Sequence, residues 1–113
     1  MDQEAPTPIT PEIEKRQYRR VKLITELGCE AMGREEVALS RDISVGGMFV
    51  TAQTPFPQNS EIALSFRLKS GEPLISCRGK IMHATKGMGM GVMFLDLSEE
   101  VRRTLREFVD EAN

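Results

Sequence analysis

The chain is poor in aromatic residues: its 113 residues include no tryptophan, one tyrosine and five phenylalanines. Proteins that bind single-stranded nucleic acids stack bases on aromatic side chains along a basic groove, and no such array is evident here. The net charge of −2 also argues against a general nucleic-acid binder, which carries an excess of basic residues. We therefore expect no nucleic-acid partner, although a strongly salt-dependent affinity for oligonucleotides would revive that alternative.

Long apolar runs are also missing. No segment approaches the roughly 20 apolar residues that span a membrane. The first six residues, MDQEAP, have neither the basic nor the apolar region of a secretory signal. The two cysteines, Cys29 and Cys77, do not form a CxxC pair. These absences lead us to expect a cytoplasmic chain with reduced thiols and no membrane insertion.

Residue combinations typical of catalysis or metal binding are scarce. His83 is the only histidine, and no carboxylate, cysteine or second histidine lies near it in the sequence. A role for His83 as metal ligand or general base is therefore not expected. No nucleophile–base pair is visible either. The sequence predicts neither an enzyme nor a metal site, and no resident cofactor.

Alternating apolar residues predict an all-β protein with a C-terminal helix. The alternation and the turn residues between runs predict five or six short antiparallel strands, at 21–27, 37–44, 48–50, 62–68, 74–84 and 91–95. Residues 98–112 change to helical spacing, with Ser98 as the expected N-cap. Strands of this number and length favour a small closed barrel, because closure removes exposed edges. The helix would cap or flank that barrel.

The second predicted strand, 37–44, has two distinct faces. Val37, Leu39 and Ile43 share one side, and Asp42 and Ser44 share the other. We expect the apolar side to be buried. On that expectation Asp42 and Ser44 lie together on the outer surface of the barrel.

Two short motifs carry the chemistry of the chain. Arg16 and Arg20 lie four residues apart in a basic run, and each guanidinium is a planar fork that fits a phosphate or the O6 and N7 edge of guanine. Asp42 and Ser44 supply hydrogen-bonding groups for a flat polar ligand. Gly47 lacks a Cβ, so backbone or ligand can approach closely there. Together the motifs predict a receptor for a small, doubly anionic guanine nucleotide.

The two motifs, in this order and inside an all-β pattern, resemble the PilZ domain family. The resemblance extends to the segment 89–94 and the helix after it, and so covers the chain from about Glu14 to Asn113. It implies a six-stranded antiparallel β-barrel that binds the bacterial second messenger cyclic di-GMP, in a single-domain member of the family. We expect a flexible, proline-containing tail at 1–14, followed by a domain at 15–113 with an arginine linker at 15–20.

The resemblance also assigns roles to individual residues. It implies that Arg16 and Arg20 contact phosphate and guanine, while the remaining motif positions line the face that holds a guanine: Asp42, Ser44 and Gly47. Lys15, Arg19 and Gly46 are further candidates for ligand contacts. In the family an arginine before the first motif arginine goes with a stacked ligand dimer. Lys15 keeps that charge without the planar fork, and we favour a stacked pair of ligands over a single one.

We expect ligand binding to order the arginine linker and to reshape a surface that a separate, unidentified effector protein reads. Motility, adhesion and exopolysaccharide production, and hence biofilm formation, are typical outputs of the family. The alternative is an interaction module with this barrel that binds no nucleotide physiologically. Taken singly, an arginine pair is most often a solvated surface, and an Asp-x-Ser before two glycines is most often an ordinary turn.

Overall fold

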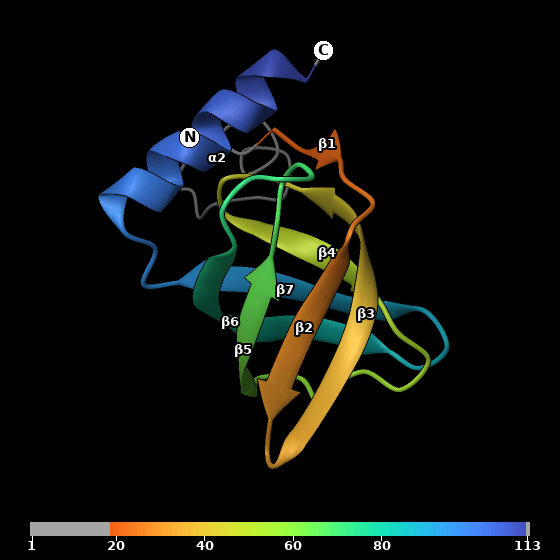
Figure 1. Ribbon diagram of the computed structural model, residues 1–113. Coiled ribbons are helices and arrows are strands. Elements are labelled where there is room, and N and C mark those ends of the chain that lie inside the picture. Colours follow the sequence, from red (N-terminus) through yellow and green to blue (C-terminus); the bar gives the residue numbers. More distant parts are fainter. Residues whose placement is uncertain (1–18, 113) are drawn as a thin grey trace, which may run out of the picture.

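The computed structural model describes residues 19–112, which form seven strands and one helix (Figure 1). The elements are β1 (Val21–Lys22), β2 (Glu26–Ala31), β3 (Arg34–Ile43), β4 (Gly47–Thr51), β5 (Glu61–Phe66), β6 (Ile75–Thr85), β7 (Gly89–Leu95) and α2 (Glu99–Glu111). The strands lie in the order β1-β3-β2-β5-β6-β7-β4, and an additional β3–β4 pairing closes β2 to β7 into a barrel. All pairings are antiparallel. The six-stranded antiparallel barrel that the sequence predicted is confirmed, whereas the expected tail at 1–14 lies outside the described residues.

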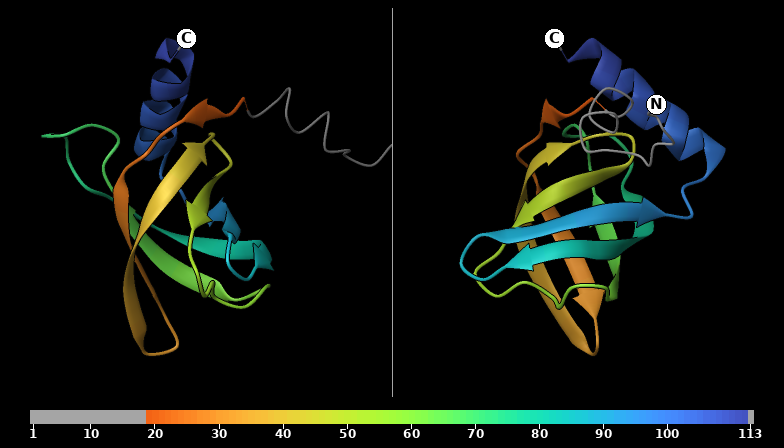
Figure 2. Two further views of the ribbon diagram at one scale, coloured as in Figure 1. Left: turned by 90° about the vertical axis from the view of Figure 1, so that its right-hand side faces the viewer. Right: turned by 180° about the vertical axis from the view of Figure 1, so that it is seen from behind.

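The helix α2 lies across one end of the barrel, at the same end as β1 (Figures 1 and 2). Ser98 is its N-cap, as the sequence predicted, and the Ser98 side chain accepts a hydrogen bond from the backbone nitrogen of Val101 at 3.1 Å. Leu105 and Val109 are buried and belong to the same apolar core as the barrel interior. The helix therefore covers the barrel end by burying one stripe of its surface. Between residues 19 and 112, no helix is long and apolar enough to cross a membrane.

The inward and outward faces of β3 exchange at a bulge. The register of β3 against β4 shifts between Ser40 and Asp42. Before the shift Val37 and Leu39 are exposed, at 74% and 47%, and after it Ile43 is fully buried. The expectation that Val37 and Leu39 share a buried face with Ile43 is therefore wrong, because an extra residue in one strand reverses the alternation of side chains beyond it.

The first predicted strand, at 21–27, is divided into β1 and β2, and a buried serine joins the two parts to β3. The Ser40 hydroxyl donates to the carbonyl oxygen of Leu23 and accepts from the backbone nitrogen of Thr25 at 3.0 Å. Buried backbone groups that leave a strand ladder need such partners. Arg20, which directly precedes β1, lies on the outer side of β3, where it contacts Asp42.

Both cysteines are free thiols in the barrel wall. Burial raises the pKa of Cys29 from 9.0 to about 11, with a smaller contribution from the Glu36 carboxylate, and burial raises the pKa of Cys77 to about 11 as well. The folded protein therefore holds these protons more tightly than the unfolded chain. The associated stability is fully present below about pH 9 and is lost as the pH rises towards 11.

We therefore expect the free energy of unfolding to fall between about pH 9 and about pH 11. Urea denaturation at about pH 8 and about pH 10.5 would measure this fall. A Cys29→Ala/Cys77→Ala double variant is the control, because it lacks both thiols and should show a smaller fall. Equal falls in the two proteins would contradict the prediction.

Candidate functional site

The connection between β3 and β4 is a tight turn held by Ser44. The backbone nitrogen of Ser44 donates to the carbonyl oxygen of Gly47 at 2.7 Å. Its hydroxyl oxygen accepts from the backbone nitrogens of Gly46 and Gly47, at 3.1 and 3.2 Å. The Ser44 residue is only 1% exposed. The expectation that Ser44 shares the outer face with Asp42 is wrong, because β3 ends at Ile43 and Ser44 turns inward to hold the loop.

Replacing Ser44 with alanine should therefore destabilise the fold. The backbone N–H groups of Gly46 and Gly47 would lose their acceptor, and an unsatisfied buried polar group costs about 1–3 kcal/mol. We expect a loss of roughly 1–2 kcal/mol in the free energy of unfolding, measured by urea denaturation. Ser76→Ala, at an exposed position of β6, is the matched control and should have little effect. Equal stability of the two variants would contradict this role of Ser44.

Gly47 packs against the backbone of β7. It pairs with Met93, and a Cβ built on Gly47 would lie 2.1 Å from the carbonyl oxygen of Val92. The close approach that the sequence predicted at Gly47 is made by the backbone of β7, and Gly47 also lines the pocket described below. The missing side chain is what allows β4 and β7 to pair beside the turn.

Asp42 is the centre of a charged cluster on the outer side of β3. Arg20 donates through Nε and Nη2 to Oδ1 of Asp42, at 2.8 and 2.6 Å, and Nε of Arg41 donates to Oδ2 at 2.9 Å. Arg20 is brought there by β1, in which Lys22 pairs with Asp42. Both arginines are substantially exposed, so these ion pairs contribute little to stability and can be exchanged for other anions. The structure thus joins one residue of each motif and adds Arg41, which the sequence reasoning did not single out.

Arg19, the neighbour of Arg20, reaches a different part of the fold. Its Nη2 donates to the carbonyl oxygen of Ala112, the C-cap of α2, at 3.1 Å. The last turn of α2 has no basic residue of its own, so Arg19 supplies the positive charge that a helix C-terminus favours. The other two residues predicted for the linker site, Lys15 and Arg16, lie outside the described residues.

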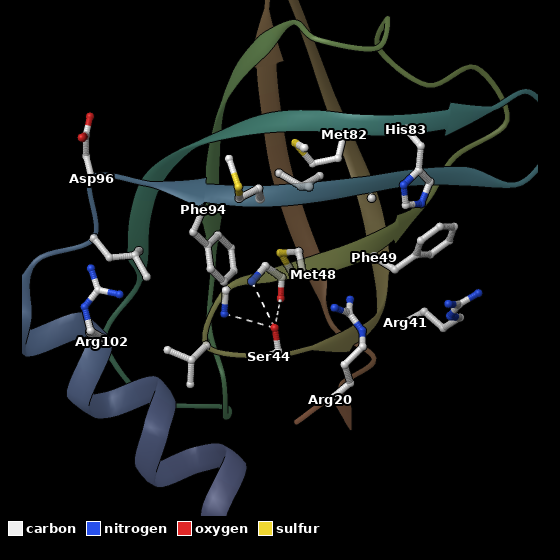
Figure 3. A pocket seen from close by; sticks show the side chains of 17 residues that line it. Arg20, Arg41, Ser44, Met48, Phe49, Met82, His83, Phe94, Asp96 and Arg102 are labelled. Atoms are coloured by element: carbon white, nitrogen blue, oxygen red, sulfur yellow. Dashed lines mark hydrogen bonds between the residues drawn. The ribbon is translucent and has the colours of Figure 1, made fainter. Parts of the chain in front are cut away.

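A pocket of about 580 Å³ opens beside the Asp42 cluster. Its walls come from the Ser44–Gly47 turn, β4, β6, β7 and the start of α2. Figure 3 shows Arg20 and Arg41 on one side of the pocket and Arg102 of α2 on the other. The volume falls in the range of about 300–1,000 Å³ that is typical of small-molecule sites. Three guanidinium groups around one pocket make it attractive to anions.

One wall of this pocket is a shelf of two tilted rings, built by a row of residues across three strands. Phe49 of β4 and His83 of β6 both pair with Gly91 of β7, and their ring centroids are 6.3 Å apart at an interplanar angle of 32°. The Arg41 guanidinium carbon lies 4.0 Å from the centre of the Phe49 ring. A Cβ on Gly91 would come within 2.4 Å of the His83 ring, so the glycine lets that ring lie over β7. Such a π surface suits a planar base.

Sequence reasoning missed the shelf and the helix residue of this pocket. Phe49, His83 and Arg102 come from β4, β6 and α2, and no local spacing connects them. For His83 the sequence predicts only that it is neither a metal ligand nor a general base. Within residues 19–112 no group of His, Cys, Asp or Glu side chains could hold a metal ion. No signal in the sequence could have found them, because they meet only in the folded barrel.

The fold and the site define a small β-barrel module whose pocket suits a planar anion. The family model of the PilZ domain matches residues 14–111. The chain belongs to the PilZ domain family. No curated protein matches the chain.

Solved structures show the same fold at low sequence identity. The inhibitor of motility of Bacillus subtilis (MotI/DgrA) matches with a TM-score of 0.75 and 18% identity over 84% of this chain and 49% of that one, so this chain spans about half its length. The PilZ domain of YcgR from Escherichia coli, solved with c-di-GMP, matches with a TM-score of 0.70 and 14% identity over 87% of this chain and 91% of that one. The PilZ domain of CeSA from a cellulose-synthesising bacterium matches with a TM-score of 0.60 and 15% identity over 81% and 95%.

Proposed function

We propose that this protein is a receptor for cyclic di-GMP. The observation that carries the proposal is the pocket itself, where the Asp42 cluster with Arg20 and Arg41 adjoins the aromatic shelf of Phe49 and His83. Cyclic di-GMP combines two phosphates with two planar guanines, so it needs both cations and flat surfaces. The YcgR domain of this fold was solved with the same nucleotide, which supports the choice of ligand.

The ion pair between Arg20 and Asp42 suggests how the ligand enters. Both partners are accessible at the surface, with side-chain exposures of 41% and 20%. A phosphate would replace Asp42 as the partner of Arg20, because guanidinium–phosphate pairs are bidentate and strong. The released Asp42 carboxylate could then accept hydrogen bonds from the N–H groups of a guanine. Arg16 and Lys15 would join from the linker at 15–20, which changes conformation in this proposal.

The adjacent arginines of the motif offer a route from the ligand to the helix. Arg20 holds the barrel through Asp42, and Arg19 holds the end of α2 through the carbonyl of Ala112. Moving Arg20 from Asp42 to a phosphate would therefore move its neighbour and change the hold on α2. We assign the exposed face of α2 as the surface that a separate effector protein reads. The linker, the barrel and the helix act as one unit in this proposal.

We further propose that the protein is a non-enzymatic adaptor in the bacterial cytoplasm that regulates motility or biofilm formation. Membership of the PilZ family supports this reading, and one structure of the same fold is an inhibitor of motility. The alternative is an interaction module of this fold without physiological nucleotide binding. The paired, accessible Arg20 and Asp42 favour the receptor, because an ion pair at the rim of a pocket is readily exchanged for a ligand.

Isothermal titration of cyclic di-GMP into the purified protein tests the proposal, with cyclic di-AMP as the matched ligand. We expect saturable binding of the guanine nucleotide and much weaker binding of the adenine one, since the two share phosphates and differ in the base edge. The stoichiometry distinguishes one bound ligand from a stacked pair. Absence of saturable binding by folded protein would favour the nucleotide-independent module.

A further inference from the structure

The pocket has a second cationic side, which belongs to the helix. We propose that Arg102 is an additional ligand-binding residue, which binds a phosphate and brings α2 into direct contact with the ligand. Figure 3 shows Arg102 facing the pocket from α2, on the side away from Arg20. The inference rests on the proposed function, since it assigns a further contact to the same site.

The electrostatics of the pocket leave Arg102 unneutralised. Arg20 and Arg41 are paired with Asp42 beside the pocket, and the carboxylate that lines the pocket, that of Asp96, is paired with Arg78. The Arg102 side chain forms no hydrogen bond or ion pair with any other residue between 19 and 112, although the residue is partly buried. A guanidinium without a protein partner is available to bind an anion beside it.

The stability of α2 gives little reason for an arginine at this position, since Glu99, three residues earlier, forms no ion pair with it. Arg102 follows the acidic first turn of the helix, close to the N-terminus, where the helix dipole disfavours a cation. It is also four residues before Arg106, and like charges at that spacing are destabilising. Both effects act against Arg102 in the isolated helix. A ligand phosphate in the pocket would offset them.

The packing of α2 directs Arg102 to the pocket. Leu105 and Val109 are the buried residues of the helix. Arg102 precedes them by three and seven residues and therefore continues the same stripe. Burial of that stripe in the core sets the rotation of the helix, so the residue one turn earlier faces the barrel at the point where the pocket opens. The neighbouring Arg103 is off the stripe and exposed.

Cations at two sides of one pocket suit a ligand with two separated phosphates. Arg20 and Arg41 would bind one phosphate and Arg102 another, so that a bound ligand spans from the barrel to the helix. With Arg19 at the other end of α2, the helix would be linked to the ligand site at both ends. Through these contacts the position of α2 would respond directly to ligand binding in the pocket.

The test compares Arg102→Gln with Arg103→Gln, its exposed neighbour, by isothermal titration of cyclic di-GMP. We expect Arg103→Gln to bind as the wild type does and Arg102→Gln to bind about tenfold more weakly or worse, the usual loss for a charge-assisted hydrogen bond. Arg102→Lys should be intermediate, because it keeps the charge and loses the fork. Thermal unfolding should show an unchanged midpoint for Arg103→Gln and an unchanged or slightly raised one for Arg102→Gln, because the neutral side chain removes the unfavourable charge near the helix N-terminus.

A second readout follows the helix itself. Saturation with cyclic di-GMP should shift the backbone amide resonances of α2 in the wild type and in Arg103→Gln, and shift them much less in Arg102→Gln. If the wild type binds, and Arg102→Gln binds with the same affinity and shows the same α2 shifts, the assignment of Arg102 is overturned. The receptor proposal would then stand. Absence of binding by the wild type would instead overturn the receptor proposal, and this assignment with it.

Discussion

Arg20→Ala is expected to weaken the binding of cyclic di-GMP about 10- to 100-fold while the barrel stays folded, since a charge-assisted hydrogen bond is worth about 1.5–3 kcal/mol. Arg20 lies outside the apolar core, and its ion pair with Asp42 is at the surface, where such pairs contribute about 0–1 kcal/mol. The substitution therefore lowers the affinity for the ligand and leaves the stability of the fold nearly unchanged. Isothermal titration measures the affinity, and urea denaturation checks the stability.

Arg67→Ala is the control for this experiment. Arg67 is an exposed arginine after β5 and away from the pocket, where its Nε donates to the carbonyl oxygen of Glu72 at 2.9 Å. The Arg67→Ala variant should bind cyclic di-GMP with wild-type affinity. If Arg20→Ala also bound with wild-type affinity, the assignment of Arg20 would be refuted. The same loss is expected for Arg16→Ala on the basis of the motif.

Gly47→Val is expected to destabilise the fold by about 3 kcal/mol or more, the upper range for overpacked positions. The new Cβ would meet the carbonyl oxygen of Val92 at 2.1 Å and the Cα of Met93 at 3.2 Å. Both are backbone atoms in a paired strand, so no side-chain rotation can relieve the clash. The β4–β7 pairing would have to open beside the Ser44 turn. Urea denaturation would show a lower midpoint.

Gly71→Ala is the matched control for steric crowding. Gly71 has a φ of 86°, and a Cβ there would have no atom within 4 Å. Alanine should therefore cost only the strain of a left-handed conformation, about 1–2 kcal/mol. A wild-type midpoint for Gly47→Val would rule out the close approach described here. Loss of ligand binding by Gly47→Val would follow from the disturbed turn, so Arg20 is the sharper probe of ligand contact.

The outcome for the Asp-x-Ser-x-x-Gly motif shows why a site is harder to predict than a strand. The motif located the right part of the chain, since Asp42, Ser44 and Gly47 all lie at or beside the pocket. Their roles in the structure differ, however. Asp42 holds arginines at the surface, Ser44 holds the turn from inside and Gly47 makes room for β7. A sequence pattern names the residues without telling which of them faces outward.

The pocket walls could not be predicted, because they are assembled across the closed barrel. Phe49 meets His83 only because β4 and β6 both pair with β7 and Gly91 leaves the space between them. Arg102 meets the same pocket only because the helix packs its apolar stripe on the barrel end. These contacts join residues far apart in the chain, and nothing in their spacing signals them.

Interactions between residues close in the sequence made the strands and the helix of this protein predictable from the amino-acid sequence. The two-residue alternation of strands, the helical spacing after Ser98 and the N-cap hydroxyl all depend on neighbours within a few positions. The bulge at β3 was not readable, because the apolar residues on either side of it, Val37, Leu39 and Ile43, all keep the same parity in the sequence. Which side of β3 carries Asp42, and which side chains surround it, therefore depended on strand pairing and barrel closure, where the free energy comes from contacts between distant segments.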